Sequence, residues 1–126
     1  MPYTVLVVND DAIDMLITVS LLETADHRVL RAFNGRQAIE QCLKSPPDLV
    51  VTDIDMPEMN GLEAARELRR LADIGRLPRI PILATSAAMS EERRRDCQEA
   101  GIRQAFGKPM DFRTLLEAVA SACEGR

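Results

Sequence analysis

The chain has 126 residues, of which 46% are hydrophobic, and a formal net charge of −4 at pH 7. This length and apolar content are typical of one compact domain, so we expect a single domain over residues 1–126. Aromatic residues make up only 3% of the sequence, and together with the negative charge this argues against nucleic-acid binding. The sequence has no apolar run of membrane-spanning length and no signal segment before the first expected strand, which predicts a cytoplasmic protein that does not contact membranes.

Short apolar runs alternate with amphipathic stretches along the whole chain. The first stretch has helical spacing through Ile13, Leu16, Ile17 and Leu21, and Ser90 and Gly101 have the composition of a helix start and a helix end. We expect helices that begin near positions 11, 35, 61, 90 and 111, and strands over 4–8, 28–32, 49–53, 80–85 and 104–107. Five strands interleaved with five helices predict an α/β fold with a doubly wound parallel sheet.

Polar side chains follow four of the expected strands, at the point where each strand ends. Because parallel strands point the same way, their carboxyl ends deliver these side chains to one rim of the sheet, where open α/β sheets bind ligands. The sequence therefore predicts one site built from four loops. Its candidate residues are Asp10, Asp11, Asp53, Asp55, Ser86 and Lys108.

Asp53 is the centre of this predicted site. It ends the apolar run 49–52, and the turn residues that follow prevent the strand from continuing. Two carboxylates about 4 Å apart repel by roughly 4 kcal/mol at an effective dielectric constant near 20, so clustered acids with a single lysine favour a divalent cation. Oxygen ligands without histidine or thiolate favour Mg²⁺ over Zn²⁺. A cation, an ammonium group and a hydroxyl suit a phosphoryl group, with Asp53 as its nucleophile, although each residue alone also fits a helix cap or turn.

The ordered set of motifs resembles the receiver domain of two-component response regulators, over essentially the whole chain. The motifs are the acidic loop Val8-Asn9-Asp10-Asp11, Asp53 at its strand end, the turn Met56-Pro57-Glu58-Met59-Asn60-Gly61, Ser86-Ala87 and Lys108-Pro109. The resemblance implies a flavodoxin-like sheet with strand order 2-1-3-4-5. It also implies a phosphoprotein of a two-component system or phosphorelay, with no turnover as an enzyme beyond its own phosphorylation and dephosphorylation.

The resemblance further implies roles for individual residues. A histidine kinase or a histidine phosphotransfer protein would donate the phosphoryl group to Asp53, and the output would pass through contacts with a downstream protein. Ser86 and Lys108 would bind the phosphoryl group, and Pro109 is a candidate for a cis peptide bond. Magnesium would be bound by Asp10, Asp53 and the backbone carbonyl of Asp55, with Asn9 as an indirect ligand through water.

The chain also departs from the receiver pattern. Receivers usually carry two adjacent acids after the first strand, whereas this chain has Asn9 before Asp10, and Asp11 is expected to cap the first helix. The position of the aromatic switch residue is occupied by Ala105, and Phe106 should point to the opposite face of the sheet. The usual threonine hydroxyl is supplied by Ser86.

Two other functions fit parts of the sequence. The chain lacks the usual acid at Asn9 and the usual aromatic residue at Ala105, which fits a degenerate receiver that acts as an interaction module independent of phosphorylation. The pair Asp53 and Asp55 resembles the nucleophile motif of haloacid-dehalogenase-type phosphatases, although that motif usually lies near the N-terminus of a longer chain.

The run 93–95 of three arginines is interpreted as a solvated helix face, with a partner-binding surface as the alternative.

Overall fold

The computed structural model describes residues 2–124, which form a central five-stranded parallel sheet in the order β2-β1-β3-β4-β5. The predicted α/β fold and strand order are therefore confirmed. The strands are β1 (Thr4–Val8), β2 (Arg28–Ala32), β3 (Leu49–Asp53), β4 (Ile82–Ser86) and β5 (Gln104–Gly107). The helices are α1 (Ala12–Thr24), α2 (Gly35–Lys44), α3 (Gly61–Asp73), α4 (Glu91–Glu99) and α5 (Phe112–Glu124). Within residues 2–124, none of the helices has the length and apolar character needed to cross a membrane.

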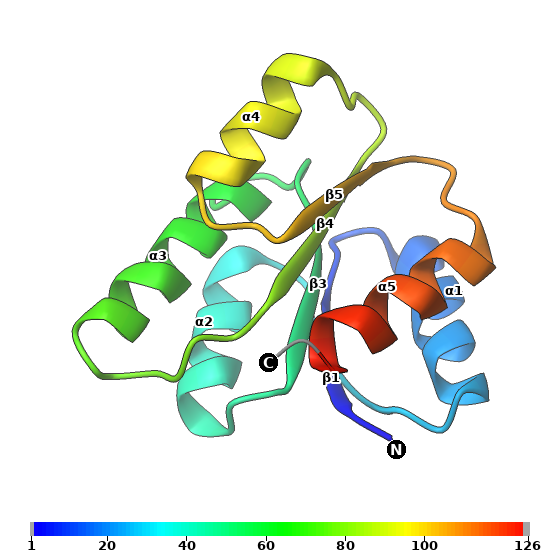
Figure 1. Ribbon diagram of the computed structural model, residues 1–126, viewed down its shortest axis with the longest axis horizontal. Coiled ribbons are helices and arrows are strands. Elements are labelled where there is room, and N and C mark those ends of the chain that lie inside the picture. The colour runs from blue at the N-terminus through cyan, green and yellow to red at the C-terminus, as the bar shows by residue number, and fades with distance from the viewer. Residues whose placement is uncertain (1, 125–126) are drawn as a thin grey trace.

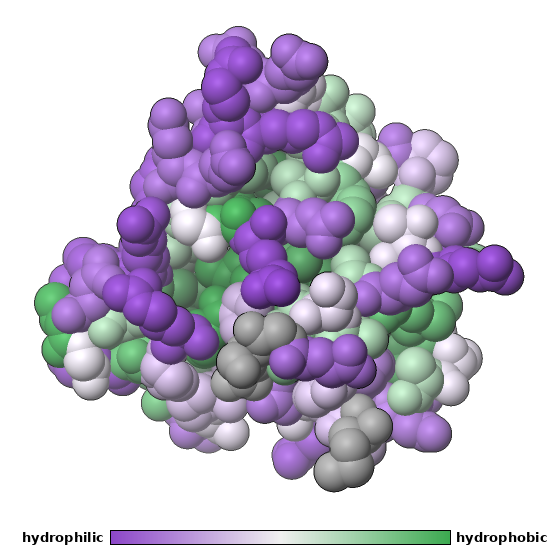
Figure 2. Space-filling view, viewed as in Figure 1, coloured by the Kyte–Doolittle hydropathy of each residue, from purple (hydrophilic) through white to green (hydrophobic). Residues whose placement is uncertain are grey.

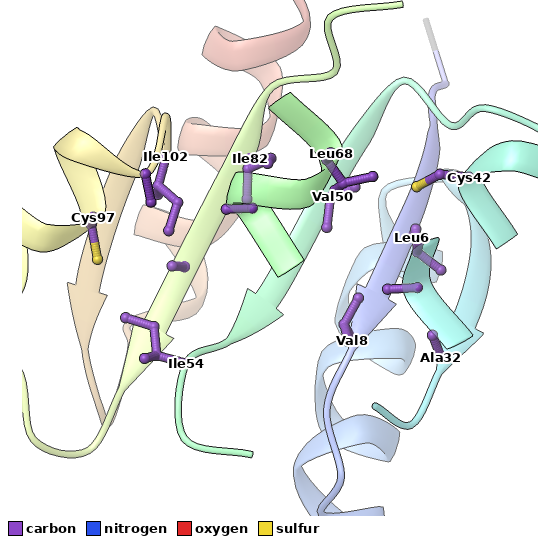
Figure 3. Close-up of a cluster of buried hydrophobic side chains, with 14 of the residues drawn as sticks. Leu6, Val8, Ala32, Cys42, Val50, Ile54, Leu68, Ile82, Cys97 and Ile102 are labelled. Atoms are coloured by element: carbon purple, nitrogen blue, oxygen red, sulfur yellow. The ribbon is translucent and has the colours of Figure 1, made fainter. Parts of the chain in front are cut away.

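Helices cover both faces of the sheet, with α1 and α5 on one side and α2, α3 and α4 on the other (Figure 1). Each face has its own apolar core because successive strand side chains point to opposite faces. Along β1, Val5 and Val7 pack with the α1 and α5 core, while Leu6 and Val8 pack with the core beneath α2, α3 and α4. Figure 3 shows the core beneath α2, α3 and α4, to which β1, β3 and β4 contribute Leu6, Val50 and Ile82. Strands β1 and β3 are therefore buried on both faces, and their carboxyl ends lie at the middle of the rim.

Helix α1 uses a different face from the one its sequence suggests. Ile13, Leu16 and Ile17 are exposed, at 70%, 62% and 47%, and the buried positions are Met15, Val19 and Leu22. The helix is apolar nearly all round, so two stripes of helical spacing compete, and the one that packs on β1 and β2 is buried. An apolar stripe on α1 is consequently left at the surface.

Strand β4 begins and ends later than predicted, at Ile82 and Ser86 rather than at positions 80 and 85. Pro81 has no N–H to donate to the ladder, which delays the start of the strand. At the other end Ser86 pairs in register with Gly107 of β5, and its carbonyl accepts from the Lys108 N–H at 2.9 Å. Ser86 is therefore the last residue of the strand and lies at the rim.

Candidate functional site

Asp53 is the last residue of β3 and is only 5% exposed. Its Oδ2 atom lies 3.3 Å from the Nζ atom of Lys108, which follows β5. Its Oδ1 atom is buried and has no hydrogen-bond partner among the described residues. The two residues that the sequence predicted at the centre of the site are thus in contact, and one carboxylate oxygen is left for a further ligand.

Burial raises the pKa of the Asp53 carboxyl above its ordinary value, and the neighbouring Lys108 charge opposes this rise without cancelling it. An ionised carboxylate away from water needs a compensating positive charge or hydrogen bonds. Lys108 supplies only part of that compensation, because it contacts one of the two oxygens. The site therefore has a negative charge and a buried carboxylate oxygen without a hydrogen-bond partner among the described residues, which suit a cation.

Lys108 also contacts a second carboxylate that sequence reasoning missed. Its Nζ atom donates to Asp14 Oδ2 at 3.0 Å. Burial lowers the pKa of the Lys108 ammonium, but the hydrogen bond to Asp14 and the charge of Asp53 together raise it above its ordinary value. Asp14 lies in the first turn of α1, three residues after Asp11, and that position next to the acidic loop was the only sequence signal for it.

Ser86 lies at the centre of a second cluster of contacts. Its hydroxyl is fully buried and donates to Asp55 Oδ2 at 2.7 Å. The Nη1 atom of Arg93, in the first turn of α4, donates to Ser86 Oγ at 3.0 Å and forms an ion pair with Asp55. Burial raises the pKa of the Asp55 carboxyl, but the bonds from Ser86 and Arg93 outweigh burial and leave that pKa below its ordinary value.

The loop after β1 holds the remaining predicted acids. Asn9 is buried and its Oδ1 atom accepts from the Asp11 N–H at 2.9 Å, which orders the loop. Asp11 caps α1 by accepting from the backbone N–H groups of Ile13 and Asp14, as expected. Asp10 is exposed. Asn9 is therefore a loop-forming residue, and Asp10 is the carboxylate of this loop that remains free of a capping role.

The magnesium site expected at this rim involves few side chains. Within residues 2–124, no three histidine, cysteine, aspartate or glutamate side chains gather in a way that would hold a metal ion. The magnesium site that the resemblance implies would need only the carboxylates of Asp10 and Asp53, because its third protein ligand would be the backbone carbonyl of Asp55. The buried Asp53 Oδ1 atom without a partner fits this role, since oxygen donors are those that Mg²⁺ prefers.

The turn after β3 fixes the backbone around Asp53. Helix α3 begins with a capping box, in which the Asn60 and Glu63 side chains each accept from the backbone N–H of the other. A Cβ atom at Gly61 would lie 2.5 Å from the Asp53 carbonyl oxygen, so only glycine allows the helix start to approach the strand end this closely. Strand β3 and α3 are therefore held together at this point.

Three features of residues 105–109 are those expected from the sequence. The peptide bond between Lys108 and Pro109 is cis, as predicted. Ala105 lies in the core beneath α4, whereas Phe106 packs on the opposite face with the α1 and α5 core. The position of the expected aromatic switch therefore holds only a buried methyl group.

The interpretation of the arginine run as a solvated helix face is wrong for Arg93, which is partly buried, whereas Arg94 and Arg95 are exposed as expected. Arg93 binds Asp55 and Ser86, and Arg94 donates from Nη1 to the carbonyl of Ala105. Only Arg95 is exposed without such a contact among the described residues. Long side chains in the first turns of a helix can reach back over the rim, which spacing alone does not reveal.

Comparisons with known proteins agree with this geometry. The family model of the response regulator receiver domain matches residues 5–120. The protein PilH of Pseudomonas aeruginosa is 31% identical over 121 residues, which cover 96% of this chain and 98% of PilH.

Two solved structures show the same fold. One is a co-crystal structure of the Saccharomyces cerevisiae histidine phosphotransfer signaling protein Ypd1 and the receiver domain of its downstream response regulator Ssk1. It aligns with a TM-score of 0.89 at 23% identity, over 96% of this chain and 88% of the other. The receiver domain of the sensor histidine kinase PA1611 from Pseudomonas aeruginosa PAO1, with a magnesium ion in its active site cleft, aligns with a TM-score of 0.87 at 23% identity, over 98% and 99% of the two chains. The family match, which spans nearly the whole chain, shows that it belongs to the response regulator receiver domains of two-component signalling.

Proposed function

We propose that this receiver accepts a phosphoryl group on Asp53 from a phosphohistidine of a histidine kinase or a histidine phosphotransfer protein, and signals through protein contacts. The observation that carries the proposal is the Asp53 carboxylate itself, which is buried, contacted by Lys108 at one oxygen and, among the described residues, without a hydrogen-bond partner at the other. Receiver domains are not turnover enzymes as a family, and here the chain would catalyse only its own phosphorylation and dephosphorylation. Family membership overturns the phosphatase alternative of the haloacid-dehalogenase type.

The transfer would proceed by attack of an Asp53 carboxylate oxygen on phosphorus. The bond between phosphorus and the donor imidazole breaks, the imidazole keeps the electron pair, and an acyl phosphate forms at Asp53. Lys108 would hold the carboxylate oriented and then neutralise part of the phosphoryl charge. Ser86 would donate its hydroxyl hydrogen to a phosphoryl oxygen.

The metal in this proposal is Mg²⁺, bound by Asp10, Asp53 and the Asp55 carbonyl, with Asn9 in indirect contact through water. When bound, Mg²⁺ would neutralise the charge that develops on the phosphoryl oxygens. Because Asn9 is neutral where receivers usually carry an acid, we expect weak but detectable binding. The Asp10→Ala variant should bind Mg²⁺ still more weakly, as measured by titration in the absence of a phosphodonor.

The direct test is incubation with acetyl phosphate, with and without Mg²⁺, followed by intact-mass measurement. Wild type should gain one phosphoryl group only with Mg²⁺, and Asp53→Asn should gain none. Asp26→Asn is the matched control, since Asp26 is exposed, lies before β2 at the other end of the sheet and has a positive φ of 64° that asparagine tolerates. Labelling of Asp53→Asn, or no labelling of wild type, contradicts the proposal, and the second result would favour the degenerate receiver.

The surface beside Lys108 is suited to docking of the phosphodonor. A pocket of about 440 Å³ lies between α1 and α5 and extends to Asp53 and Lys108. Ile17 of the exposed apolar stripe of α1 and Phe112, the first residue of α5, line this pocket, and a donor histidine must approach Asp53 from the rim. The exposed apolar residues are Ile13, Leu16, Ile17 and Phe112. The Ypd1 co-crystal structure supports a histidine phosphotransfer protein as a class of partner.

Docking can be separated from chemistry by comparing two kinds of phosphodonor. Replacement of Leu16 by serine should slow phosphorylation by a phosphotransfer protein and leave phosphorylation by acetyl phosphate unchanged, because Leu16 lies on the surface and not in the site. Leu43→Ser is the control, since Leu43 is also exposed, at 42%, but lies on α2. Equal transfer rates for all three proteins would show that the α1 stripe does not dock the donor.

A further inference from the structure

We infer that Arg93 is the positioning residue through which occupancy of the phosphoryl site reaches α4, an inference that rests on the proposed phosphorylation of Asp53. Coupling through an aromatic side chain on β5 is not possible at Ala105, because this residue provides only a methyl group. Arg93 instead connects α4 to the hydroxyl that the phosphoryl group is proposed to use. The chain therefore carries a polar link between the site and the helix.

The Ser86 hydroxyl has no spare capacity for hydrogen bonding in this structure. A hydroxyl group has one hydrogen to donate and two lone pairs with which to accept. The hydrogen is donated to Asp55 Oδ2 at 2.7 Å, and the oxygen accepts from Arg93 Nη1 and from the Ala88 N–H, each at 3.0 Å. Donation to a phosphoryl oxygen therefore requires that the bond to Asp55 is given up.

Loss of that bond changes the surroundings of Arg93. Its Nη1 atom contacts both Ser86 Oγ and Asp55. The position of the Arg93 side chain therefore depends on the hydrogen bond between Ser86 and Asp55, which phosphorylation would break. Arg93 belongs to the first turn of α4, and its backbone N–H is capped by the Ser90 side chain. A change in the Arg93 contacts is therefore transmitted to the start of α4 and to the 86–90 loop.

The neighbouring arginines provide an internal comparison. Arg94 donates to the backbone carbonyl of Ala105, a contact that does not involve the Ser86 hydroxyl. Arg95 is exposed and contacts neither group. Three consecutive residues of equal charge thus differ in their relation to the site, and only Arg93 touches the hydroxyl.

The test is to compare backbone amide spectra of isotopically labelled full-length wild type, Arg93→Gln and Arg95→Gln, each with Mg²⁺ and with or without beryllofluoride, an analogue of the phosphoryl group. In wild type and Arg95→Gln, beryllofluoride should shift the amides of residues 91–94. In Arg93→Gln these amides should already be displaced toward their wild-type bound positions before beryllofluoride is added, and should move little on its addition. Such a displacement in the free protein is expected only if Arg93 holds one of two alternative positions of α4.

The amides of residues 53–56 and 86–88 separate the two possible failures. If they shift in all three proteins but the α4 amides of Arg93→Gln behave like those of wild type, Arg93 does not couple the site to α4. If they shift in none of the three proteins, the proposed phosphorylation of Asp53 fails, and the inference fails with it. Unchanged β1 and α2 amides show that the substitution has left the fold intact.

Discussion

On each side of Asp53 a cation pairs with carboxylates, but the two cations are arranged differently. On the side of α1 and α5, Lys108 bridges Asp53 and Asp14, so the cation contacts Asp53 directly. On the side of α4, Arg93 pairs with Asp55 and reaches the hydroxyl of Ser86, so the cation contacts neighbours of Asp53. The first arrangement stabilises the charge of Asp53, whereas the second controls a hydrogen-bond donor.

The comparison shows that two ion pairs of similar composition contribute differently to stability when their carboxylates differ in burial. Lys108 is paired with a carboxylate that is 6% exposed at its side chain, while Arg93 is paired with one that is 42% exposed. Ion pairs in water-accessible positions contribute little to stability, and buried charges left without a partner cost much more. Removal of either cation should therefore distinguish the two sides.

The largest effect is expected for Lys108→Met, which removes the cation and keeps the apolar stem. Because Asp53 would remain buried without its partner, we expect a loss of about 2 kcal/mol in the free energy of unfolding at pH 7. This loss is smaller than the full cost of an isolated buried charge, because Lys108 is partly exposed. Urea denaturation measures the loss. Lys44→Met is the control, because Lys44 is exposed on α2, and equal loss in both variants would show that the Lys108 charge is not the cause.

A smaller effect of opposite sign is expected for Asp53→Asn. Burial raises the pKa of Asp53 in the folded protein, so wild-type stability falls as the pH rises from the ordinary aspartate range through that raised pKa. The asparagine variant avoids this loss and should be more stable by about 1 kcal/mol at pH 7, with no advantage below about pH 3, where Asp53 is protonated in both states. A destabilised variant at pH 7 would show that the attraction of Lys108 outweighs burial.

The smallest effect is expected for Arg93→Gln, about 0.5 kcal/mol at pH 7, because the pair with Asp55 is partly exposed. The pKa of Asp55 is lowered in the folded protein, so this contribution is present above the ordinary aspartate pKa and is lost as the pH falls through the lowered value. Denaturation of Arg93→Gln and Arg95→Gln over a series of pH values measures it. A difference that persists in strong acid would exclude the ion pair as its source.

Much of the fold and the centre of the site could be predicted from the sequence, because the ends of the strands can be recognised in it. Asp53, Ser86 and Lys108 are each the last residue of a parallel strand or its immediate successor, and parallel strands bring their ends to one rim. Their positions depend on chain order and not on details of packing. The magnesium ligands and the phosphoryl transfer itself stay predictions.

Asp14 and Arg93 could not be predicted in the same way because both side chains project from helices toward the rim. Whether such a side chain reaches the site depends on how the helix is rotated against the sheet. For α1 that rotation was ambiguous, since Met15 and Leu16 lie on competing apolar stripes and only packing on the sheet selects one. The sequence pattern identifies the helices but not these contacts.

The weak apolar anchoring of α4 has a consequence for local unfolding. Within Glu91–Glu99 only Cys97 is buried, whereas α3 buries five residues, and Figure 2 shows a predominantly hydrophilic surface over α4. A helix held mainly by polar side-chain contacts can detach while the rest of the domain stays folded, and its amide hydrogens should exchange with solvent well before those of α3. A partner that traps α4 in a displaced position would therefore have to supply only the free energy of this local opening, which is far below that of unfolding the domain.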